Sequence, residues 1–518
     1  MSRKTRVRFA PSPTGPLHMG GVRTALYNYL FAKQRGGDFI IRIEDTDSQR
    51  FVPGAEKYII EALNWCGIVP DEGVDAAGNV VETVSERHPH APYRQSQRKP
   101  IYRQYAEQLV ENGYAYYAFD TAEELGAKRA EMEAAGQTFI YGQTTRMGLR
   151  NSLAMDEAEV KELLETRTDW TIRFKMPENR VVKMDDLIRG HVEVNTSTLD
   201  DKVLWKRADE LPTYHLANIV DDHLMEITEV IRGEEWLPSL PLHYLLYEAF
   251  GWTDTQPRFA HLSLLLKPDG KGKLSKRDGD RLGFPVFPLQ WVNSEGEVSR
   301  GYREDGYFPE AFVNLLAMLG WNPGTEQELF SLEELVQAFS LERVIKSGAR
   351  FNADKAKWYN KEYLRKKSVG ELTDLYMPIL EAKGISATRE YVEKVVALIQ
   401  ERATFVADFW DIASYLFVAP TEFVEKDAAK FWKEENYTLA LQVADFIVNF
   451  EGEFTKESLE GPLEEYIRGN EWPMGKVMNC LRLAMVGASN GLGIADIVTL
   501  IGKKEFAKRI DFIKATLC

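Results

Sequence analysis

The sequence has few cysteines and no long apolar segment. Cys66, Cys480 and Cys518 are its only cysteines, and no two of them have the spacing of zinc ligands or of a small disulfide framework. No window approaches the roughly 18 apolar residues that a membrane helix needs, and the N-terminus lacks the apolar core of a secretory signal. These absences exclude membrane-spanning and disulfide-stapled proteins. We expect a reducing, cytoplasmic environment and no metal site.

Basic residues are also in the minority. There are 64 Lys and Arg against 79 Asp and Glu, which gives a formal net charge of −15. Because phosphate contacts require Lys and Arg, this average argues against a nucleic-acid partner, although a local basic stripe can still attract RNA. With 44% hydrophobic residues, the chain has ample material for a core. At about 100–200 residues per domain, its length predicts three to five domains.

The N-terminal pattern predicts a βαβ unit. Arg6–Ala10 has the pattern of a short strand, and the prolines and glycine of the following loop, Pro11–Pro16, exclude helix there. Apolar residues then recur at helical spacing until a Gly-Gly pair at 36–37, and Asp38–Glu44 has the pattern of a buried strand. A strand, a helix and a strand in this order give a parallel pair.

The rest of the chain predicts a second α/β stretch and a helical end. Beyond about Ser331, the apolar residues keep helical spacing to the C-terminus. The other expected elements are a helix that begins at Pro53 and runs to about Trp65, helices near Ile101–Asn112 and Ala122–Ala135, a strand at Met225–Ile231, a helix at Pro238–Phe250 and an irregular insertion at Gly283–Gly306.

The loop Pro11–Gly21, PSPTGPLHMGG, is the first candidate site. It joins the first strand to the first helix, at the carboxyl edge of the sheet where doubly wound folds bind ligands. The helix N-terminus offers unpaired N–H groups and a positive dipole end to phosphate, and Gly20 and Gly21 allow close approach. His18 can donate to a phosphate or ribose oxygen. A Pro-Gly turn with a structural histidine is the alternative.

A basic loop, Lys273–Arg277, is the second candidate site. It follows Lys267 and Lys271 and lies among several glycines, which indicates a mobile electropositive arm. Such an arm could stabilise the charge that develops on a phosphate during transfer. A solvated basic loop is the alternative, since that is the usual meaning of a charge run.

Together the two loops resemble the HIGH and KMSKS signatures of class I aminoacyl-tRNA synthetases. Further segments are similar to glutamyl-tRNA synthetases: Arg8–Gly15, Arg42–Asp47, Tyr93–Ser96, Pro212–Asn218, Val220–His223 and Ile231–Trp236. The last HIGH position is Gly21 rather than histidine. Members with zinc carry cysteines near Tyr114–Ala118, where this chain has none, so the resemblance predicts no zinc. Gly283–Gly306 is not part of the pattern.

The resemblance implies an α/β fold with a doubly wound parallel-sheet, Rossmann-like catalytic domain. An inserted acceptor-binding domain interrupts it, and an all-α anticodon-binding region follows. The expected boundaries are 1–110 and 206–255 for the catalytic halves, 111–205 for the insertion, 256–340 for a stem-contact region with the KMSKS-like loop, and 341–518 for the helical region.

Glutamate has two carboxylates and one ammonium, so its pocket needs cations, hydrogen-bond donors and one anion. Arg8 and Arg232, each at a strand end, can form forked carboxylate contacts, and an isolated arginine could instead be a structural ion pair. Two such cations would disfavour glutamine, because its amide leaves buried charge unpaired. The full expected set, in agreement with the contacts that the family implies, is Arg8, Ala10, Ser12, Glu44, Tyr214, Asn218 and Arg232.

The implied reaction uses ATP, with Mg²⁺ on its phosphates, and needs no protein nucleophile. His18, Lys273 and Lys276 are expected to stabilise the transition state. The expected ATP contacts are Pro11, Thr14, Gly15, His18, Gly20, Gly21, Trp236, Lys273, Leu274, Ser275, Lys276 and Arg277. The glutamyl group would pass to the 2′-hydroxyl at the end of tRNA-Glu, and the family resemblance suggests a monomer.

Four other functions compete with this interpretation. A glutaminyl-tRNA synthetase usually lacks the string Ala10–Gly15, and a shortened relative that modifies a tRNA base lacks the roughly 180 residues after Leu341. A catalytically dead RNA-binding scaffold does not need His18 and Lys276. A small-molecule nucleotidyltransferase leaves the helical half unexplained. ATP–pyrophosphate exchange with glutamate, with tRNA present, separates the proposed enzyme from a catalytically dead scaffold.

Arg402 aligns by pattern with the family arginine that reads the third anticodon base, and a solvated helix arginine is the alternative. We predict that Arg402→Ala raises the KM for tRNA and leaves adenylate formation unchanged, because unstacked anticodon bases are read by stacking and edge hydrogen bonds far from the active site. Steady-state aminoacylation with varied tRNA measures this, and unchanged tRNA kinetics would remove the assignment.

Overall fold

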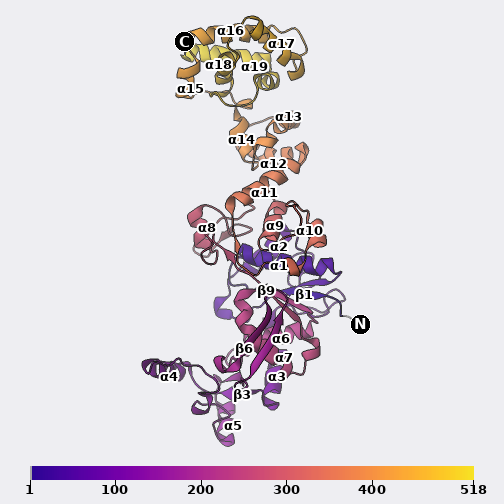
Figure 1. Ribbon diagram of the computed structural model, residues 1–518, viewed down its shortest axis with the longest axis vertical. Helices are drawn as coiled ribbons and strands as arrows, with labels where there is room; N and C mark the ends of the chain where they lie inside the picture. Colours follow the sequence, from indigo (N-terminus) through magenta and orange to yellow (C-terminus); the bar gives the residue numbers. More distant parts are fainter. Residues whose placement is uncertain (1–2, 518) are drawn as a thin grey trace. The chain divides into compact units, whose positions relative to one another are not determined.

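The computed structural model describes residues 3–517, and the chain divides into two compact units between Tyr359 and Asn360. Figure 1 follows the chain through the first unit and then the second. Among residues 3–517, no helix is both long and apolar enough to cross a membrane.

The first unit contains all of the strands in the described part of the chain. They are β1 (Arg6–Phe9), β2 (Asp38–Ile41), β3 (Ala115–Ala118), β4 (Thr171–Phe174), β5 (Val181–Asp186), β6 (Gly190–Asn195), β7 (Val203–Lys206), β8 (Leu211–Pro212), β9 (Glu229–Gly233), β10 (Arg258–Leu262), β11 (Leu265–Leu266), β12 (Trp291–Val292), β13 (Val298–Ser299) and β14 (Ala349–Arg350).

Its helices cover and connect these strands. They are α1 (Met19–Gln34), α2 (Ala55–Trp65), α3 (Lys99–Glu111), α4 (Ala122–Ala134), α5 (Glu157–Thr166), α6 (Tyr214–Leu224), α7 (Leu240–Ala249), α8 (Lys276–Leu282), α9 (Pro309–Met318), α10 (Leu332–Ala338) and α11 (Ala353–Lys366), which contains the division between the units.

The central sheet is doubly wound. β1 pairs in parallel with β2, and on its other side the Thr228 N–H, just before β9, donates to the Arg6 carbonyl at 2.9 Å. β9, β10 and β5 continue the sheet in parallel, and β6 closes it antiparallel to β5. The chain therefore leaves β1 toward β2 and later returns to its opposite side. This is the switch point where such sheets bind ligands at their carboxyl edge.

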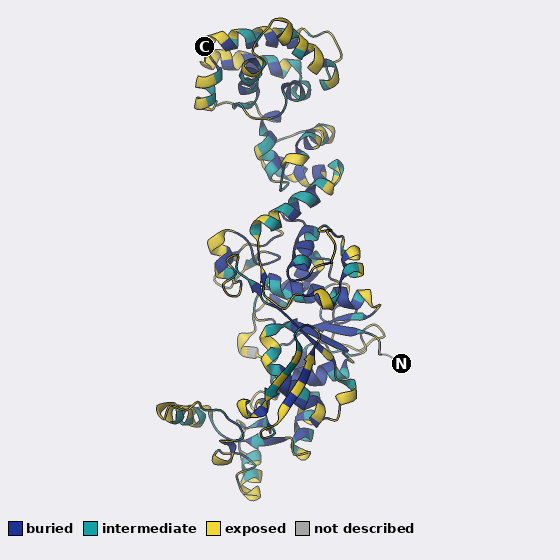
Figure 2. Cartoon of the chain, in the orientation of Figure 1, coloured by how far each residue is buried: buried dark blue, intermediate teal, exposed yellow. Residues whose placement is uncertain are grey.

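The core of this unit lies between the sheet and the helices that cover it. All four residues of β1 are buried, and so is most of α1, whose Tyr27 hydroxyl donates to the carbonyls of Ala317 and Leu319. Figure 2 shows much of the sheet in the buried colour, whereas β5 alternates buried and exposed residues and β6 contains no buried residue. The predicted α/β class with a parallel sheet is confirmed.

A second, antiparallel sheet, β3-β4-β7-β8, is inserted between α3 and α6. Tyr116, Ala118 and Tyr141 form its small buried cluster, and the Tyr116 hydroxyl donates to Asp201 at 2.6 Å. α4 and α5 next to it contain no buried residue, so they are surface helices (Figure 2).

Several element boundaries differ from those expected. α2 begins at Ala55 rather than Pro53, because Gly54 takes a left-handed conformation with φ of 84° at the N-cap. The expected strand at 225–231 begins at Glu229, since Glu226 has φ of 57° and forms a turn. The expected helix at 238–250 begins as a 3-10 turn and becomes α7 only at Leu240.

The segment Gly283–Gly306 is more ordered than expected. It contains the antiparallel pair β12–β13 and packs on α2, where Trp291 meets the Tyr58 ring edge-on at 5.3 Å. The Tyr58 hydroxyl donates to the Leu289 carbonyl. The insertion is therefore anchored to the rest of the first unit through α2.

The second unit is helical over its described residues, 360–517, as the spacing predicted. The expected all-α region from 341 onward also contains the short strand β14, which pairs in parallel with β11. Phe409 and Val395 are fully buried in it. Its helices are α12 (Val369–Ala382), α13 (Arg389–Ile399), α14 (Asp408–Ala413), α15 (Glu425–Phe431), α16 (Glu434–Val448), α17 (Lys456–Gly469), α18 (Met474–Val486) and α19 (Ile494–Leu517), the last with a break at Gly502.

A buried ion cluster joins the first two strands of the sheet to α6. The fully buried Arg42 lies 2.8 Å from Asp222, 3.2 Å from Glu44 and 3.7 Å from Asp221. Asp222 also accepts two hydrogen bonds from Arg8, at 2.9 and 3.2 Å. Arg98, also buried, donates to Asp221 at 2.8 Å. Three arginines and three carboxylates therefore share one buried site, in which each charge depends on the others.

We predict that Arg42→Met lowers the free energy of unfolding of the first unit by about 3–5 kcal/mol, because three carboxylates lose their shared cation in a dry site. Urea denaturation followed by circular dichroism measures the change. Arg103→Met is the matched control, since the one ion pair of Arg103 among residues 3–517 is with the exposed Glu107 on α3, and its loss should cost less than about 1 kcal/mol. Equal destabilisation by the two variants would contradict the prediction.

Candidate active site

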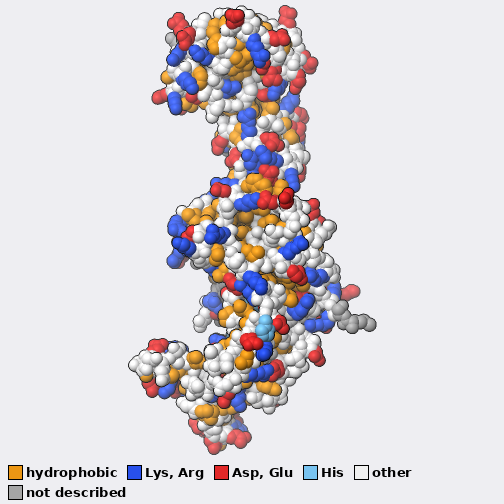
Figure 3. Space-filling model, viewed as in Figure 1, with side chains coloured by type: hydrophobic (Ala, Val, Ile, Leu, Met, Phe, Trp, Pro, Cys, Tyr) orange, Lys and Arg blue, Asp and Glu red, His pale blue; other side chains and the backbone are white. Residues whose placement is uncertain are grey.

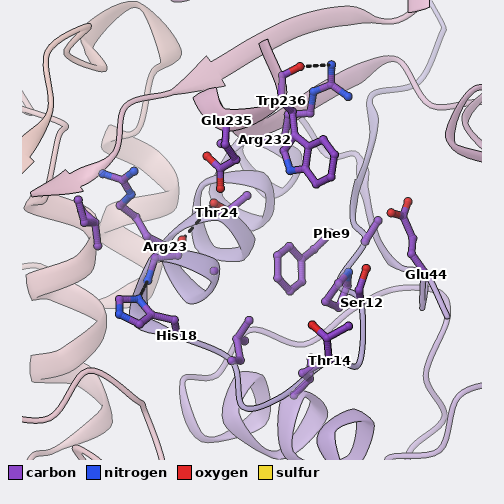
Figure 4. Close-up of a pocket in the computed structure, with 18 of the residues that line it drawn as sticks. Phe9, Ser12, Thr14, His18, Arg23, Thr24, Glu44, Arg232, Glu235 and Trp236 are labelled. Atoms are coloured by element: carbon purple, nitrogen blue, oxygen red, sulfur yellow. Dashed lines mark hydrogen bonds between the residues drawn. The ribbon is translucent and has the colours of Figure 1, made fainter. Parts of the chain in front are cut away.

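A pocket of about 830 Å³ opens at the carboxyl ends of β1 and β9. Ligand pockets of enzymes commonly have this size. Figure 4 shows His18 and Glu44 on opposite sides of the cavity with Phe9 between them. The structure brings most of the expected residues to its lining: Arg8, Ala10, Pro11, Ser12, Thr14, Gly15, His18, Gly20, Gly21, Glu44, Tyr214, Asn218, Arg232, Trp236, Lys273, Leu274 and Ser275.

His18 is the N-cap of α1. Its Nδ1 accepts the Gly20 N–H at 3.2 Å, so the ring proton is assigned to Nε2. Nε2 is buried and has no hydrogen-bond partner among the described residues. Burial, together with the nearby Lys273 ammonium, lowers the pKa of His18 to about 4. The imidazole is therefore a neutral donor at physiological pH.

The first amides of α1 are not free, contrary to the sequence-based expectation. The Met19 N–H donates to the Val286 carbonyl at 2.9 Å, the Gly20 N–H donates to His18, and the Gly21 N–H donates to the His18 carbonyl at 2.8 Å. The reason is that His18 caps its own helix and the insertion supplies a further acceptor. The N-terminus of α1 therefore offers a phosphate its helix dipole and the Nε2–H group of His18.

The basic loop reaches the pocket only in part. Lys273 lies on its rim, 3.8 Å from Glu235. Lys276 and Arg277 are not among the lining residues, because Lys276 is the first residue of α8, where Ser275 and Asp278 form a capping box. Figure 3 shows Lys and Arg side chains gathered over α8.

Arg8 lines the pocket, but its charge is already paired. Both carboxylate oxygens of Asp222 accept from its guanidinium. Beside it, one oxygen of Glu44 accepts from Arg42 and from the Asn218 amide, each at 3.2 Å. Burial raises the pKa of Glu44 above its ordinary value, and Arg42 and Arg8 oppose that rise. A ligand cation next to Glu44 would lower this pKa again.

Arg232 differs from Arg8, because its hydrogen-bond partners in the described structure are all uncharged. Its Nε donates to His261 Nε2 at 3.0 Å, and its two terminal nitrogens contact the Tyr214 hydroxyl at 2.8 Å, His243 Nδ1 at 3.3 Å and the Trp236 carbonyl at 3.4 Å. No carboxylate of residues 3–517 forms an ion pair with it, although only 4% of its surface is exposed. A buried cation of this kind favours an anionic ligand.

Tyr214 and Trp236 complete the wall near Arg232. Their rings stack with centroids 4.1 Å apart, so Trp236 lies against the residues expected to bind glutamate rather than against the HIGH-like loop. Burial raises the pKa of Tyr214, which therefore stays protonated. Since its oxygen accepts from Arg232, its proton can be donated to a ligand. The Asn218 Oδ1 is buried without a partner among residues 3–517 and can accept.

Arg402 lies in the second unit, in a 3-10 turn after α13. Its side chain is exposed and donates to the Gly491 carbonyl at 3.3 Å.

Sequence reasoning missed several lining residues. Phe287, from the insertion, meets the His18 ring edge-on with centroids 6.0 Å apart. Arg23, on α1, lines the pocket and donates hydrogen bonds to the carbonyls of Ser263 and Leu319. Position 23 follows the HIGH-like motif by two residues, a signal that could have been used. Nothing in the sequence indicated Phe287, because its segment matched no known pattern.

The protein families that this sequence matches agree with this geometry. Residues 4–358 match the catalytic domain of the class I tRNA synthetases (E and Q), and residues 371–514 match an anticodon binding domain. The fold and the pocket therefore define a class I aminoacyl-tRNA synthetase.

Similar proteins identify the family within this class. The chain is 56% identical to a glutamate–tRNA ligase of Parabacteroides distasonis, with 98% of each chain covered, and 55% identical to one of Christiangramia forsetii, with 100% of each covered. A crystal structure of a glutamate tRNA ligase from Elizabethkingia meningosepticum, in complex with its amino acid, matches all of both chains at 52% identity and a TM-score of 0.94. The chain belongs to the glutamate–tRNA ligase family.

We predict that His18 stays neutral, as the Nε2–H tautomer, down to about pH 5, because its folded pKa is about 4 against 6.5 in an ordinary environment. Since the unfolded chain protonates this histidine at higher pH, its contribution to stability is full above 6.5 and is lost as the pH falls toward 4. ¹⁵N NMR of histidine-labelled protein, assigned with His18→Asn, follows the titration. A midpoint near 6.5 would contradict burial of the ring.

Proposed function

We propose that the chain activates L-glutamate with ATP to form glutamyl-adenylate and then transfers the glutamyl group to the 3′-terminal adenosine of tRNA-Glu. The single observation that carries this proposal is the placement of charge in one pocket. An unpaired buried cation, Arg232, and a buried carboxyl, Glu44, lie together with the His18 donor and the Lys273 ammonium.

Glutamate fits this arrangement in one orientation. Its side-chain carboxylate would accept from Arg232 and from the Tyr214 hydroxyl, and its ammonium would lie against Glu44 and the Asn218 oxygen. Arg8, already paired with Asp222, would contribute hydrogen bonds and orientation rather than net charge. Glutamine would leave the Arg232 charge uncompensated, which disfavours it.

Adenylate formation would then be an in-line transfer. An α-carboxylate oxygen of glutamate attacks the α-phosphorus of ATP, the bond to the bridging oxygen breaks, and pyrophosphate leaves with the electron pair. The His18 Nε2–H and the Lys273 ammonium would stabilise the added negative charge. Lys276 and Arg277 would have to join the phosphates by movement of the loop, whose Gly270 and Gly272 take φ of 77° and 92°.

Mg²⁺ fits as a partner of the nucleotide. The two lining carboxyls, Glu44 and Glu235, already pair with Arg42 and Lys273, so the protein offers no preformed set of metal ligands in the pocket. The ion would be held by phosphate oxygens and water, and it would neutralise phosphate charge. We expect no zinc in this protein.

The second half-reaction needs tRNA. The terminal 2′-hydroxyl would attack the adenylate carbonyl and release AMP. We propose that the antiparallel insertion within 111–205 binds the acceptor end, that 256–340 contacts the stem and that the helical region 341–518 reads the anticodon, with Arg402 among the contacts. We further propose that the enzyme is a cytoplasmic monomer.

Aminoacylation of separate tRNA-Glu and tRNA-Gln transcripts tests the proposal. We predict that glutamate is attached to tRNA-Glu, that glutamine is not attached to either, and that glutamate-dependent ATP–pyrophosphate exchange occurs when tRNA is present. Attachment of glutamate to tRNA-Gln as well would define a broader tRNA specificity within the same reaction.

The matched variant is His18→Asn, which retains an N-cap acceptor but lacks the Nε2–H donor. Its rate of adenylate formation should fall by about 10²–10³-fold at an unchanged melting temperature. Glutamine attachment by the wild-type protein, or full activity of His18→Asn, would contradict the proposal.

A further inference from the structure

A buried histidine–aspartate pair stands behind Arg232, outside the pocket lining. His261 on β10 and Asp186 at the end of β5 have fully buried side chains, and His261 Nδ1 lies 2.6 Å from Asp186 Oδ2. On its other side, His261 Nε2 lies 3.0 Å from Arg232 Nε. Three residues from three neighbouring strands therefore form one line of hydrogen bonds that ends at the pocket.

The direction of every proton in this line is fixed by chemistry. An arginine Nε–H can only donate, so His261 Nε2 must be the acceptor and must lack a proton. The ring proton then lies on Nδ1 and is donated to Asp186, whose carboxylate can only accept. Burial, with the Arg232 charge, lowers the pKa of His261, so the ring is neutral.

The Asp186 carboxylate is held in a single orientation. Its Oδ1 accepts the backbone N–H groups of Ile188 at 2.9 Å, Arg189 at 2.8 Å and His261 at 3.3 Å. Burial alone would raise the pKa of Asp186, but the bonds from His261 and from these amides hold it below its ordinary value. Only Oδ2 is directed at the imidazole.

We infer that Asp186 and His261 are positioning residues for glutamate recognition, which hold the Arg232 guanidinium in place through a neutral acceptor and so leave its charge free for the substrate carboxylate. This inference rests on the proposed glutamate site. A carboxylate in direct contact with Arg232 would orient it equally well but would neutralise it, as Asp222 does to Arg8. With an imidazole between them, the anion orients the arginine without occupying its forked face.

His243 supports the same arrangement from α7. Its Nδ1 is 3.3 Å from an Arg232 terminal nitrogen and its Nε2 is 3.3 Å from His215 Nδ1. Burial, then the charge of Arg232, lowers the pKa of His243 well below its ordinary value. Arg232 is thus held by two neutral imidazoles, and only the His261 ring is fixed in turn by a carboxylate.

Asp186→Asn tests the inference, because it changes which atoms donate and accept along these hydrogen bonds while the side chain keeps nearly the same shape. Three backbone N–H groups keep the amide oxygen at the Oδ1 position, so the new NH₂ faces His261 Nδ1. The imidazole must then accept there and carry its proton on Nε2, directly against the Arg232 Nε–H. We expect the KM for glutamate to rise by about 10- to 100-fold, as for loss of a hydrogen bond to a charged group. The KM values for ATP and tRNA should stay at wild-type values.

Asp185→Asn is the matched control. It makes the same chemical change one residue earlier on β5, where the side chain is 88% exposed and contacts His191. It should leave all three KM values unchanged. An Asp186→Asn variant that folds, with an unaltered melting temperature and an unaltered KM for glutamate, would overturn the inference.

A second measurement keeps the inference testable if Asp186→Asn does not fold. ¹⁵N NMR of the wild-type protein should show His261 as the Nδ1–H tautomer, and in folded Asp186→Asn as the Nε2–H tautomer. An Nε2–H tautomer in the wild type would overturn the inference. Failure of the wild type to charge tRNA-Glu with glutamate would instead overturn the proposed function, and the tautomer would still report on the line of hydrogen bonds.

Discussion

The site depends on one imbalance of buried charge. Burying an ion without a counter-ion is costly, so a protein usually pairs or neutralises it. Arg8 and Arg42 follow this rule in their cluster with Asp222 and Glu44. Arg232, which lines the same pocket as Arg8, does not, since its hydrogen-bond partners among residues 3–517 are all neutral. A substrate carboxylate can supply the negative charge that Arg232 lacks.

The fold makes this imbalance possible. β1 and β9 lie side by side at the switch point of the sheet, so their carboxyl ends bring Arg8 and Arg232 to one cavity from positions more than 200 residues apart. β10 and β5, farther along the same sheet, place His261 and Asp186 directly behind Arg232. The sheet register therefore sets both the binding groups and the groups that orient them.

The sequence predicted those elements and motifs that short local patterns encode. The βαβ unit and the place of the HIGH-like loop at the carboxyl edge of the sheet follow from strand, turn and helix signals around His18. The helical end follows from apolar spacing, and the resemblance supplied the glutamate contacts. These signals are local, or are motifs of known spacing, and they need no knowledge of how side chains pair.

The sequence could not predict how charges are distributed among partners. It named Arg8 and Arg232 as equivalent cations, whereas only the folded chain shows Asp222 on the first and His261 on the second. Likewise, the Val286 carbonyl that occupies the first amide of α1 comes from an insertion with no recognisable pattern. Both outcomes depend on tertiary contacts across long stretches of chain.

The charge imbalance at Arg232 is tested most directly by comparing the dissociation constants of glutamate and of glutamine in the wild type and in Arg232→Gln. If the unpaired guanidinium selects the substrate by its charge, the affinity for glutamate falls by at least about a hundredfold, and the affinity for glutamine does not fall with it. An equal loss for the two amino acids would show that Arg232 shapes the pocket without reading charge.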